Sequence, residues 1–306
     1  IILSYRENKA WSDRQSAELL GALEKLRDIR GRRDSPSLDT KIITAWNGIM
    51  ISAMALAHRV CAEQRYYDRA QAAAKFIRDR LFYDQQLMRS YCEGEVKHPA
   101  CLEDYVFFID GLLSLYQSDF DPDWLRLALN LQQIQDRKLW DVQDNLYFFA
   151  QENELFARKK EVFDGAIPSA NNQAVLNLLR LDFFFPNNGF ATRARAILRR
   201  LSHLMGRYPR AFPTALCSLD ASLSGIDSLV IAYGSQKRAA LDIIREVRMA
   251  YCPDLLVCVH TEELSALKEK MGLNNKNTYY LCAGNVCYPA TTKPDEIKVL
   301  LEGVVK

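Results

Sequence analysis

Apolar and amphipathic stretches alternate along the first 225 residues of the chain. The stretch 42–57 carries no charged side chain, and its apolar positions cover both faces of a helix, so we expect a helix that is buried all round. Three further apolar helices are predicted to begin near residues 103, 169 and 214. Amphipathic helices with one polar face are predicted to follow the first three apolar helices.

This alternation predicts a mainly α protein in which buried inner helices pair with outer helices, as in a partial α/α toroid of about four helical hairpins. The toroid portion is expected to cover residues 1–225, with an additional amphipathic helix over 11–30. The long connections, which include predicted β-hairpins within 84–102 and 141–164, all lead from an outer helix to the next inner helix. They should therefore gather at one end of the toroid, and long apolar loops in compact domains are commonly functional.

The pattern changes after Gly225. Two strand-like stretches, 226–234 and 254–260, flank a predicted helix over 237–250, which is a βαβ arrangement. A short helix over 261–271, two strands around 279–282 and 286–288, and a last helix over 294–301 should follow. We expect residues 226–306 to form a small α/β appendage packed on the toroid.

Composition and charge exclude several classes of function. The net charge of +2 gives no electrostatic footprint for nucleic acid. The sequence shows no signal peptide and no apolar stretch long enough for a confident membrane span, which favours a soluble, cytoplasmic protein. There is no glycine-rich phosphate loop, and neither the histidines nor the cysteines have the spacing of a zinc site, so we expect no metal and no cofactor.

The chain has eight cysteines, several of them inside apolar stretches, where cysteine usually serves as a small buried apolar residue. Cys282 and Cys287 are separated by four residues in the strand-rich part of the appendage. They are expected to be free or buried thiols. The alternatives are that they pair with each other or bind the thiol of a partner.

Polar and aromatic residues cluster where three of the inner helices begin. The clusters are Asp39, Lys41, Trp46 and Asn47; Glu103, Asp104 and Tyr105; and Asp164, Ser169, Asn171 and Asn172. Helix N-termini present free N–H groups that suit hydroxyl-rich or anionic ligands, and carboxylates placed there can act as general acid and base. The acid/base candidates are therefore Asp39, Asp104 and Asp164, and the residues expected to hold the ligand are Lys41, Trp46, Asn47, Glu103, Tyr105 and Asn171.

Each candidate also has a structural interpretation. Asp39, Asp104 and Ser169 are suited to cap helices, and tryptophans such as Trp46 more often belong to a core than to a binding surface. Asp110 is unusual because it lies inside an apolar helix, where an unpaired carboxylate is costly. It should either face a central cavity or, as we favour, bond to a neighbouring helix.

Four ordered blocks also carry a family resemblance: DSPSLDTKIITAWNGIMISA, LEDYVFFIDGLLSLY, DGAIPSANNQAVLNLLRL and CAGNVCYPATTKPDEIKVLL. They resemble the C-terminal part of the YyaL-type thioredoxin-domain proteins, a family that includes the sperm-associated thioredoxin-like proteins. The resemblance implies an (α/α)6 toroid similar to six-hairpin glycosidases and N-acylglucosamine 2-epimerases. It also implies that an N-terminal remainder, with a thioredoxin-like domain, is a partner of this part.

Two functions follow as hypotheses. The first is a carbohydrate-active domain, like an epimerase, an isomerase or a glycoside hydrolase, that binds a sugar-like small molecule where the inner helices begin. The second is a non-catalytic scaffold that presents clients or ligands to a thioredoxin-like domain outside this chain. Convergence of carboxylates, amides and aromatic side chains at the helix starts favours the first.

Overall fold

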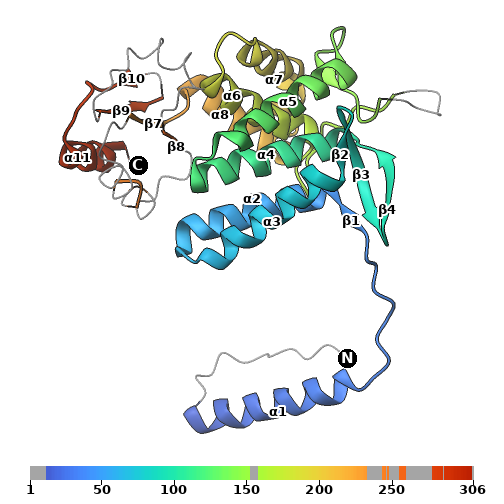
Figure 1. Ribbon diagram of the computed structural model, residues 1–306. Helices are drawn as coiled ribbons and strands as arrows, with labels where there is room; N and C mark the ends of the chain where they lie inside the picture. Colours follow the sequence, from blue (N-terminus) through green and yellow to red (C-terminus); the bar gives the residue numbers. More distant parts are fainter. Residues whose placement is uncertain are drawn as a thin grey trace. The chain divides into compact units, whose positions relative to one another are not determined.

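A computed structural model describes residues 12–151, 158–232, 243–245, 247, 255–259, 278–284 and 286–304. The chain divides into two compact units, Ile1–Thr40 and Lys41–Lys306. The first unit contains helix α1 (Asp13–Gly31), which confirms the helix predicted over 11–30 (Figure 1). Ser12 caps this helix together with the side chain of Gln15, and its leucines recur along an exposed amphipathic surface.

The second unit is built from helical hairpins, and their order confirms the predicted inner and outer helices. The inner helices are α2 (Thr44–Cys61), α4 (Leu102–Asp119), α6 (Ala170–Phe184) and α8 (Pro213–Ser224). The outer helices are α3 (Gln64–Arg80), α5 (Pro122–Leu139) and α7 (Phe190–Arg207). Successive inner helices pack on one another, and each outer helix packs on the inner helix that precedes it. This is a partial α/α toroid, in which a 3-10 turn, η1 (Pro209–Ala211), leads into α8.

Helix α4 is the centre of the core. It packs against α2, α5 and α6, and its apolar side chains from Leu102 to Tyr116 are buried. The polar side chain of Asp110 does not face an apolar neighbour, because it pairs with Arg180 of α6 at 2.8 Å and accepts a bond from Gln173 at 3.3 Å. The favoured interpretation, a bond to a neighbouring helix, is therefore the one that the structure shows.

The prediction that the helix over 42–57 is buried all round is wrong. One face of α2 packs on α3 and α4, but Trp46, Met50, Leu56 and Val60 are each more than half exposed. The sequence of α2 is apolar on both faces, but the described residues of this unit pack against only one of them. Amphipathic periodicity cannot distinguish an apolar face that a neighbour covers from one that is left open.

Short strands gather where α2 and α4 begin, and they form one small sheet and one two-stranded ladder. The sheet contains β1 (Ile42–Ile43), β2 (Phe82–Tyr83), β3 (Gln86–Cys92) and β4 (Glu95–Pro99), and the ladder contains β5 (Trp140–Asp141) and β6 (Leu146–Tyr147). The antiparallel pairing of β3 with β4 across Gly94 confirms the first predicted hairpin. Both β1 and β4 pair with β3, so this sheet joins the start of α2 to the segment that leads into α4.

The C-terminal sheet has the order β10-β9-β7-β8. Its strands are β7 (Ser228–Ala232), β8 (Leu256–Val259), β9 (Thr278–Ala283) and β10 (Val286–Cys287), and helix α11 (Pro294–Val304) follows them. Strands β7 and β8 are parallel, as a βαβ arrangement requires. The helix predicted over 237–250 is described only at 243–245 and 247, where it is helical, and the helix predicted over 261–271 lies outside the described residues.

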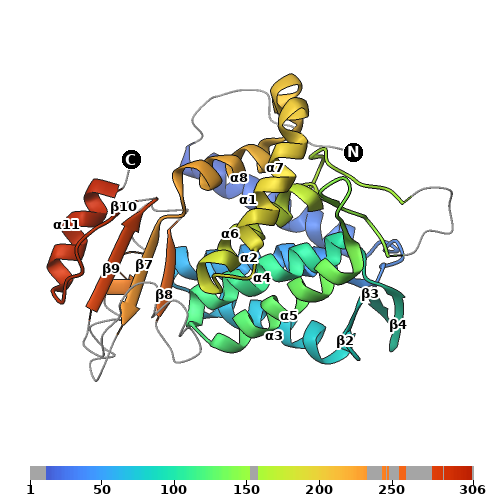
Figure 2. The same ribbon diagram turned by 90° about the horizontal axis from the view of Figure 1, so that it is seen from above.

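Helix α4 fixes this sheet to the helical hairpins. The side-chain amide of Gln117 accepts a bond from the N–H of Val257 at 2.8 Å and donates to its carbonyl at 2.9 Å. The amide thereby satisfies the β8 edge as a neighbouring strand would. The two views agree that the β7–β10 sheet and the β1–β4 sheet lie at opposite ends of the helices (Figure 2).

Candidate functional site

Asp104, in the first turn of α4, joins the starts of two inner helices. Its Oδ1 accepts a hydrogen bond from the backbone N–H of Ala45 in α2 at 3.0 Å, and its Oδ2 accepts one from the N–H of Cys101 at 2.9 Å. Both donors belong to the N–H groups that a helix start leaves without an intrahelical partner. These two bonds brace α2 against α4. Asp104 is completely buried, so its carboxylate does not contact solvent.

Arg89 of β3 links Asp104 to the neighbouring carboxylate, Glu103. Its guanidinium lies 3.2 Å from Oδ2 of Asp104 and 3.8 Å from Oε2 of Glu103. The side chain of Glu103 keeps 20% of its surface exposed, whereas that of Asp104 keeps none. Burial raises the pKa of Glu103, and the charge of Glu161 raises it further, while Arg89 and Lys159 act in the opposite direction.

Asp104 should make the stability of the protein depend on pH. Burial raises its pKa to about 6, although Arg89 and the two backbone N–H groups oppose that shift. Between about pH 4, near the pKa of an unfolded aspartate, and pH 6 the folded protein binds a proton that the unfolded chain has released. The free energy of unfolding should therefore fall as the pH rises through this window, by up to about 3 kcal/mol from this group.

Urea unfolding of the parent and of Asp104→Asn at a series of pH values checks this expectation. The difference in unfolding free energy between the two proteins should change between pH 4 and 6 and stay level above pH 7. Asp68→Asn, which replaces an exposed aspartate, should follow the parent throughout. Parallel profiles for the parent and Asp104→Asn would contradict the raised pKa.

Asp164 has a similar position between the other two inner helices. Its Oδ1 accepts bonds from the N–H of Ser169 at 2.8 Å and from the amide of Asn172 at 2.9 Å. Its Oδ2 accepts a bond from the N–H of Thr214, in the first turn of α8, at 2.9 Å. Asp164 therefore holds the start of α6 against the start of α8, as Asp104 holds α2 against α4.

A chain of backbone contacts joins the two pairs of helices at the same end. The N–H of Leu102 donates to the carbonyl of Phe149 at 2.8 Å, and the N–H of Phe149 donates to the carbonyl of Lys159 at 2.8 Å. The side-chain amide of Asn171 in α6 then donates to the backbone carbonyl of Glu161 at 3.0 Å. The starts of α2, α4, α6 and α8 are thus connected in sequence, and the charges of Lys159 and Glu161 act on the carboxyl group of Glu103.

The other candidate residues differ in how accessible they are. Tyr105 and Asn171 are buried, and Asn171 bonds to both the N–H and the carbonyl of Tyr147, so these two side chains belong to the framework. Trp46 is 62% exposed, and Asn47 donates to the carbonyl of Ile43 at 2.9 Å.

Two candidates lie ahead of the first inner helix. Lys41 is exposed at the beginning of the second unit. Asp39 is exposed in the first unit.

No sequence pattern pointed to Arg89, although this residue makes the ion pairs of the site. It lies in the middle of a short strand that is separated by more than ten residues from the carboxylates it binds. Only the pairing of β3 with β1 and β4 brings its side chain to the start of α4. Across the described ranges, no group of three or more His, Cys, Asp or Glu side chains is arranged to hold a metal ion.

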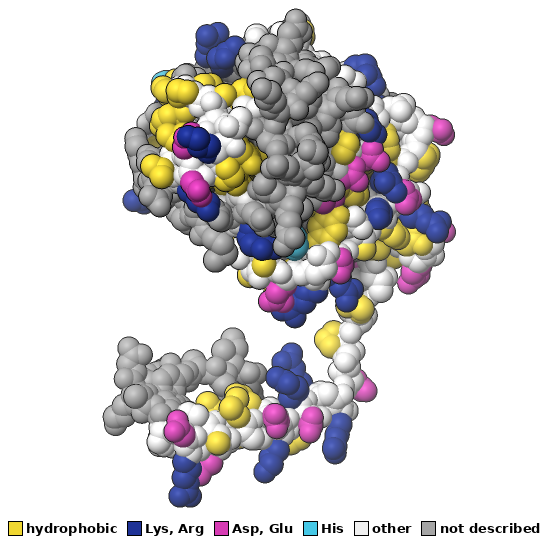
Figure 3. Space-filling view, turned by 60° about the vertical axis from the view of Figure 1, so that its left-hand side comes forward, with side chains coloured by type: hydrophobic (Ala, Val, Ile, Leu, Met, Phe, Trp, Pro, Cys, Tyr) yellow, Lys and Arg dark blue, Asp and Glu magenta, His cyan; other side chains and the backbone are white. Residues whose placement is uncertain are grey.

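Surface charge and helix length give two further observations. On the face shown in Figure 3, Lys and Arg side chains are interspersed with Asp and Glu side chains among the atoms drawn in colour. Every helix in the described part of the chain is too short or too polar to cross a membrane.

The fold and the site define the chain as a helical-hairpin protein whose inner helix starts are joined by two carboxylates, of which Asp104 is completely buried and Asp164 partly buried. Over 92% of its length it is similar to spermatogenesis-associated protein 20 of Homo sapiens, with 33% identity across 305 residues. The protein of the same name from Rattus norvegicus is 31% identical over 91% of the chain. These homologues confirm the predicted resemblance to the sperm-associated thioredoxin-like proteins. The chain spans 39% and 38% of their respective lengths.

Two solved structures show a similar arrangement at low sequence identity. A GH76 alpha-mannanase of Bacteroides thetaiotaomicron has a TM-score of 0.49 and 12% identity, covering 79% of this chain and 73% of its own. A cellobiose 2-epimerase of Bacillus thermoamylovorans has a TM-score of 0.49 and 13% identity, covering 79% of this chain and 64% of its own. No family model matches the chain.

Proposed function

We propose that the end of the protein where α2 and α4 begin binds a sugar-like ligand, and that Glu103 exchanges a proton with it. The observation that carries this proposal is the contrast between the two adjacent carboxyl groups on Arg89. Asp104 is completely buried, whereas Glu103 retains exposed surface and has a raised pKa. Glu103 is therefore the carboxyl group that a ligand can reach.

The chemistry of the surrounding side chains suits a carbohydrate. A carboxyl group with a raised pKa holds its proton closer to neutral pH and can donate it to a glycosidic or hydroxyl oxygen. The guanidinium of Arg89, 3.8 Å from Glu103, can stabilise the carboxylate that remains. Trp46 follows Ala45, which binds Asp104, and its exposed indole offers an apolar surface for the face of a sugar ring.

This proposal changes the roles expected for the aspartates. Asp104 and Asp164 each accept bonds from the starts of two inner helices, so they act as positioning residues in the proposed site. The acid/base role passes to Glu103, which was expected only to hold the ligand.

Titration calorimetry with a panel of reducing mono- and disaccharides tests the proposal. We expect at least one sugar to bind the parent protein and to bind Glu103→Gln at least tenfold more weakly, because the amide cannot supply the proton or the charge. Glu95→Gln, which changes an exposed glutamate on β4, serves as the matched control and should bind as the parent does. Failure of every sugar to bind, or equal binding by Glu103→Gln, would overturn the proposal.

A second candidate function rests on the exposed apolar residues of α2, Trp46, Met50, Leu56 and Val60. An apolar helix face of this kind is typical of a contact with another protein, which is the scaffold hypothesis. The same titration separates the two candidates, since a scaffold would bind none of the sugars.

A further inference from the structure

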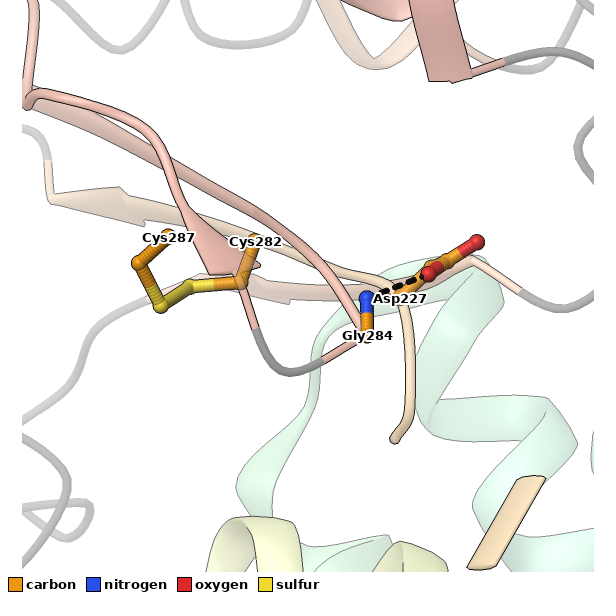
Figure 4. The surroundings of a disulfide bond; sticks show 4 residues. All are labelled: Asp227, Cys282, Gly284 and Cys287. Atoms are coloured by element: carbon orange, nitrogen blue, oxygen red, sulfur yellow. Dashed lines mark hydrogen bonds between the residues drawn. A yellow bond between two sulfur atoms is a disulfide. The ribbon is translucent and has the colours of Figure 1, made fainter. Parts of the chain in front are cut away.

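The last two strands of the C-terminal sheet are linked by a disulfide between Cys282 and Cys287. The expectation of free or buried thiols at these positions is therefore wrong. Spacing alone could not decide this, because the pairing depends on the register of β9 with β10, which places the two cysteines directly opposite each other. Figure 4 shows the bond, together with the contact between Gly284 and Asp227.

Other contacts already hold this hairpin in place. The N–H of Gly284 donates to Oδ1 of Asp227 at 2.7 Å, and the N–H of Tyr288 donates to the carbonyl of Leu281 at 2.9 Å. A disulfide that closes so short a loop removes less entropy from the unfolded chain than one that closes a long loop. The hydrogen bonds and the strand pairing therefore share the structural role of the bond, which leaves room for a chemical role.

The two cysteine residues differ in exposure. Cys287 is exposed on the edge strand β10, whereas Cys282 is 5% exposed on β9, between β10 and β7. Both cysteines also line a cavity of about 620 Å³ between the sheet and helices α6, α7 and α8. Because a thiolate must approach one sulfur of a disulfide to attack it, accessibility selects Cys287 as the attacked sulfur.

We propose that Cys282 and Cys287 form a thiol–disulfide exchange site whose reaction partner is a dithiol. A thiolate of the dithiol bonds to Sγ of Cys287 and breaks the Sγ–Sγ bond, so that Cys282 leaves as a thiolate and takes a proton from water. The second thiol of the partner, after losing its proton, attacks its own sulfur in the mixed disulfide and releases Cys287. Two electrons pass from the dithiol to the protein, and the reverse sequence oxidises the pair again.

Exchange at this position would also alter the cavity. Cys287 and the following Tyr288 belong to its wall, while Phe183 of α6 and Arg195 of α7 lie on the helical side. Without the covalent bond, the pairing of β10 with β9 and the bond from the N–H of Tyr288 to the carbonyl of Leu281 still hold this wall. Reduction therefore replaces the disulfide in the wall by two thiols and leaves the helices opposite unchanged.

The first test uses the full chain in native buffer. After treatment with dithiothreitol, cysteines are alkylated and the modified peptides are identified by mass spectrometry. We expect the Cys282–Cys287 bond to open while the circular dichroism spectrum and thermal midpoint stay close to those of the oxidised protein. A bond that opens only when the chain unfolds would overturn the proposal.

The second test separates the two sulfurs with single substitutions. In Cys282→Ser, oxidised glutathione should form a mixed disulfide on Cys287 at least tenfold faster than it does on Cys282 in Cys287→Ser. Cys217, an exposed free cysteine on α8, reports the general reactivity of thiols in both variants. Equal rates, or a faster reaction at Cys282, would overturn the assignment of Cys287 as the attacked sulfur.

Discussion

Gly48→Ala is expected to destabilise the protein by about 3 kcal/mol or more, because the added methyl group has no space between α2 and α4. A Cβ at Gly48 would lie 2.5 Å from the carbonyl carbon of Phe107, 2.6 Å from its oxygen and 2.6 Å from the nitrogen of Phe108. These are backbone atoms of the buried helix α4, so they cannot move aside as a flexible side chain would. The two helices would have to separate.

The same contact is close from the opposite side. A Cβ at Gly111 of α4 would lie 2.9 Å from the carbonyl oxygen of Gly48 and 3.1 Å from Cγ2 of Ile51. The glycines therefore allow the two inner helices to approach closely, which brings Ala45 to within 3.0 Å of Asp104. Separation of the helices would weaken this bond as well, so we expect Gly48→Ala to disturb the candidate site in addition to the core.

Gly206→Ala in α7 is the matched control, because nothing lies within 4 Å of the added Cβ. Alanine favours a helix over glycine by about 1 kcal/mol, and this gain acts alone at Gly206, whereas at Gly48 the clash outweighs it. Urea unfolding should therefore show a lower midpoint for Gly48→Ala and an unchanged or higher midpoint for Gly206→Ala. Equal midpoints for the two variants would show that α2 and α4 are not packed through Gly48.

Periodicity and capping signals predicted the helices well. The apolar spacing and the Asp121–Pro122 start predicted α5, and Pro213 marked the beginning of α8. The alternation of inner and outer helices also predicted which helices pack together. These features are local, since each depends on residues within one or two helical turns.

Features that depend on tertiary contacts could not be predicted in this way. The sequence of α2 is apolar on both faces, and only the positions of α3 and α4 determine that Trp46 and Val60 remain exposed. The sequence placed Asp104 correctly at a helix start, but its bond to Ala45 spans 59 residues. The pairing of Cys282 with Cys287 likewise required the strand register.

Asp164→Ala should lower the free energy of unfolding by about 3 kcal/mol, because it leaves several donors at two helix starts without their acceptor. The N–H groups of Ser169 and Thr214 lie 2.8 Å and 2.9 Å from its two oxygens, and the amide of Asn172 shares one of them. These groups are partly buried, so water replaces the lost bonds incompletely. The loss therefore includes both the cap of α6 and the contact between α6 and α8.

Two further variants make this prediction specific. Asp164→Asn keeps one oxygen acceptor but turns an amide N–H toward a backbone donor, so its loss of stability should be intermediate. Asp68→Ala removes an exposed carboxylate that accepts a bond from Gln64 in its own helix, and it should change stability by less than about 0.5 kcal/mol. If chemical unfolding showed Asp164→Ala to be as stable as Asp68→Ala, Asp164 would not hold the two helices together. An accessible Asp164 would then return as an acid/base candidate beside Glu103.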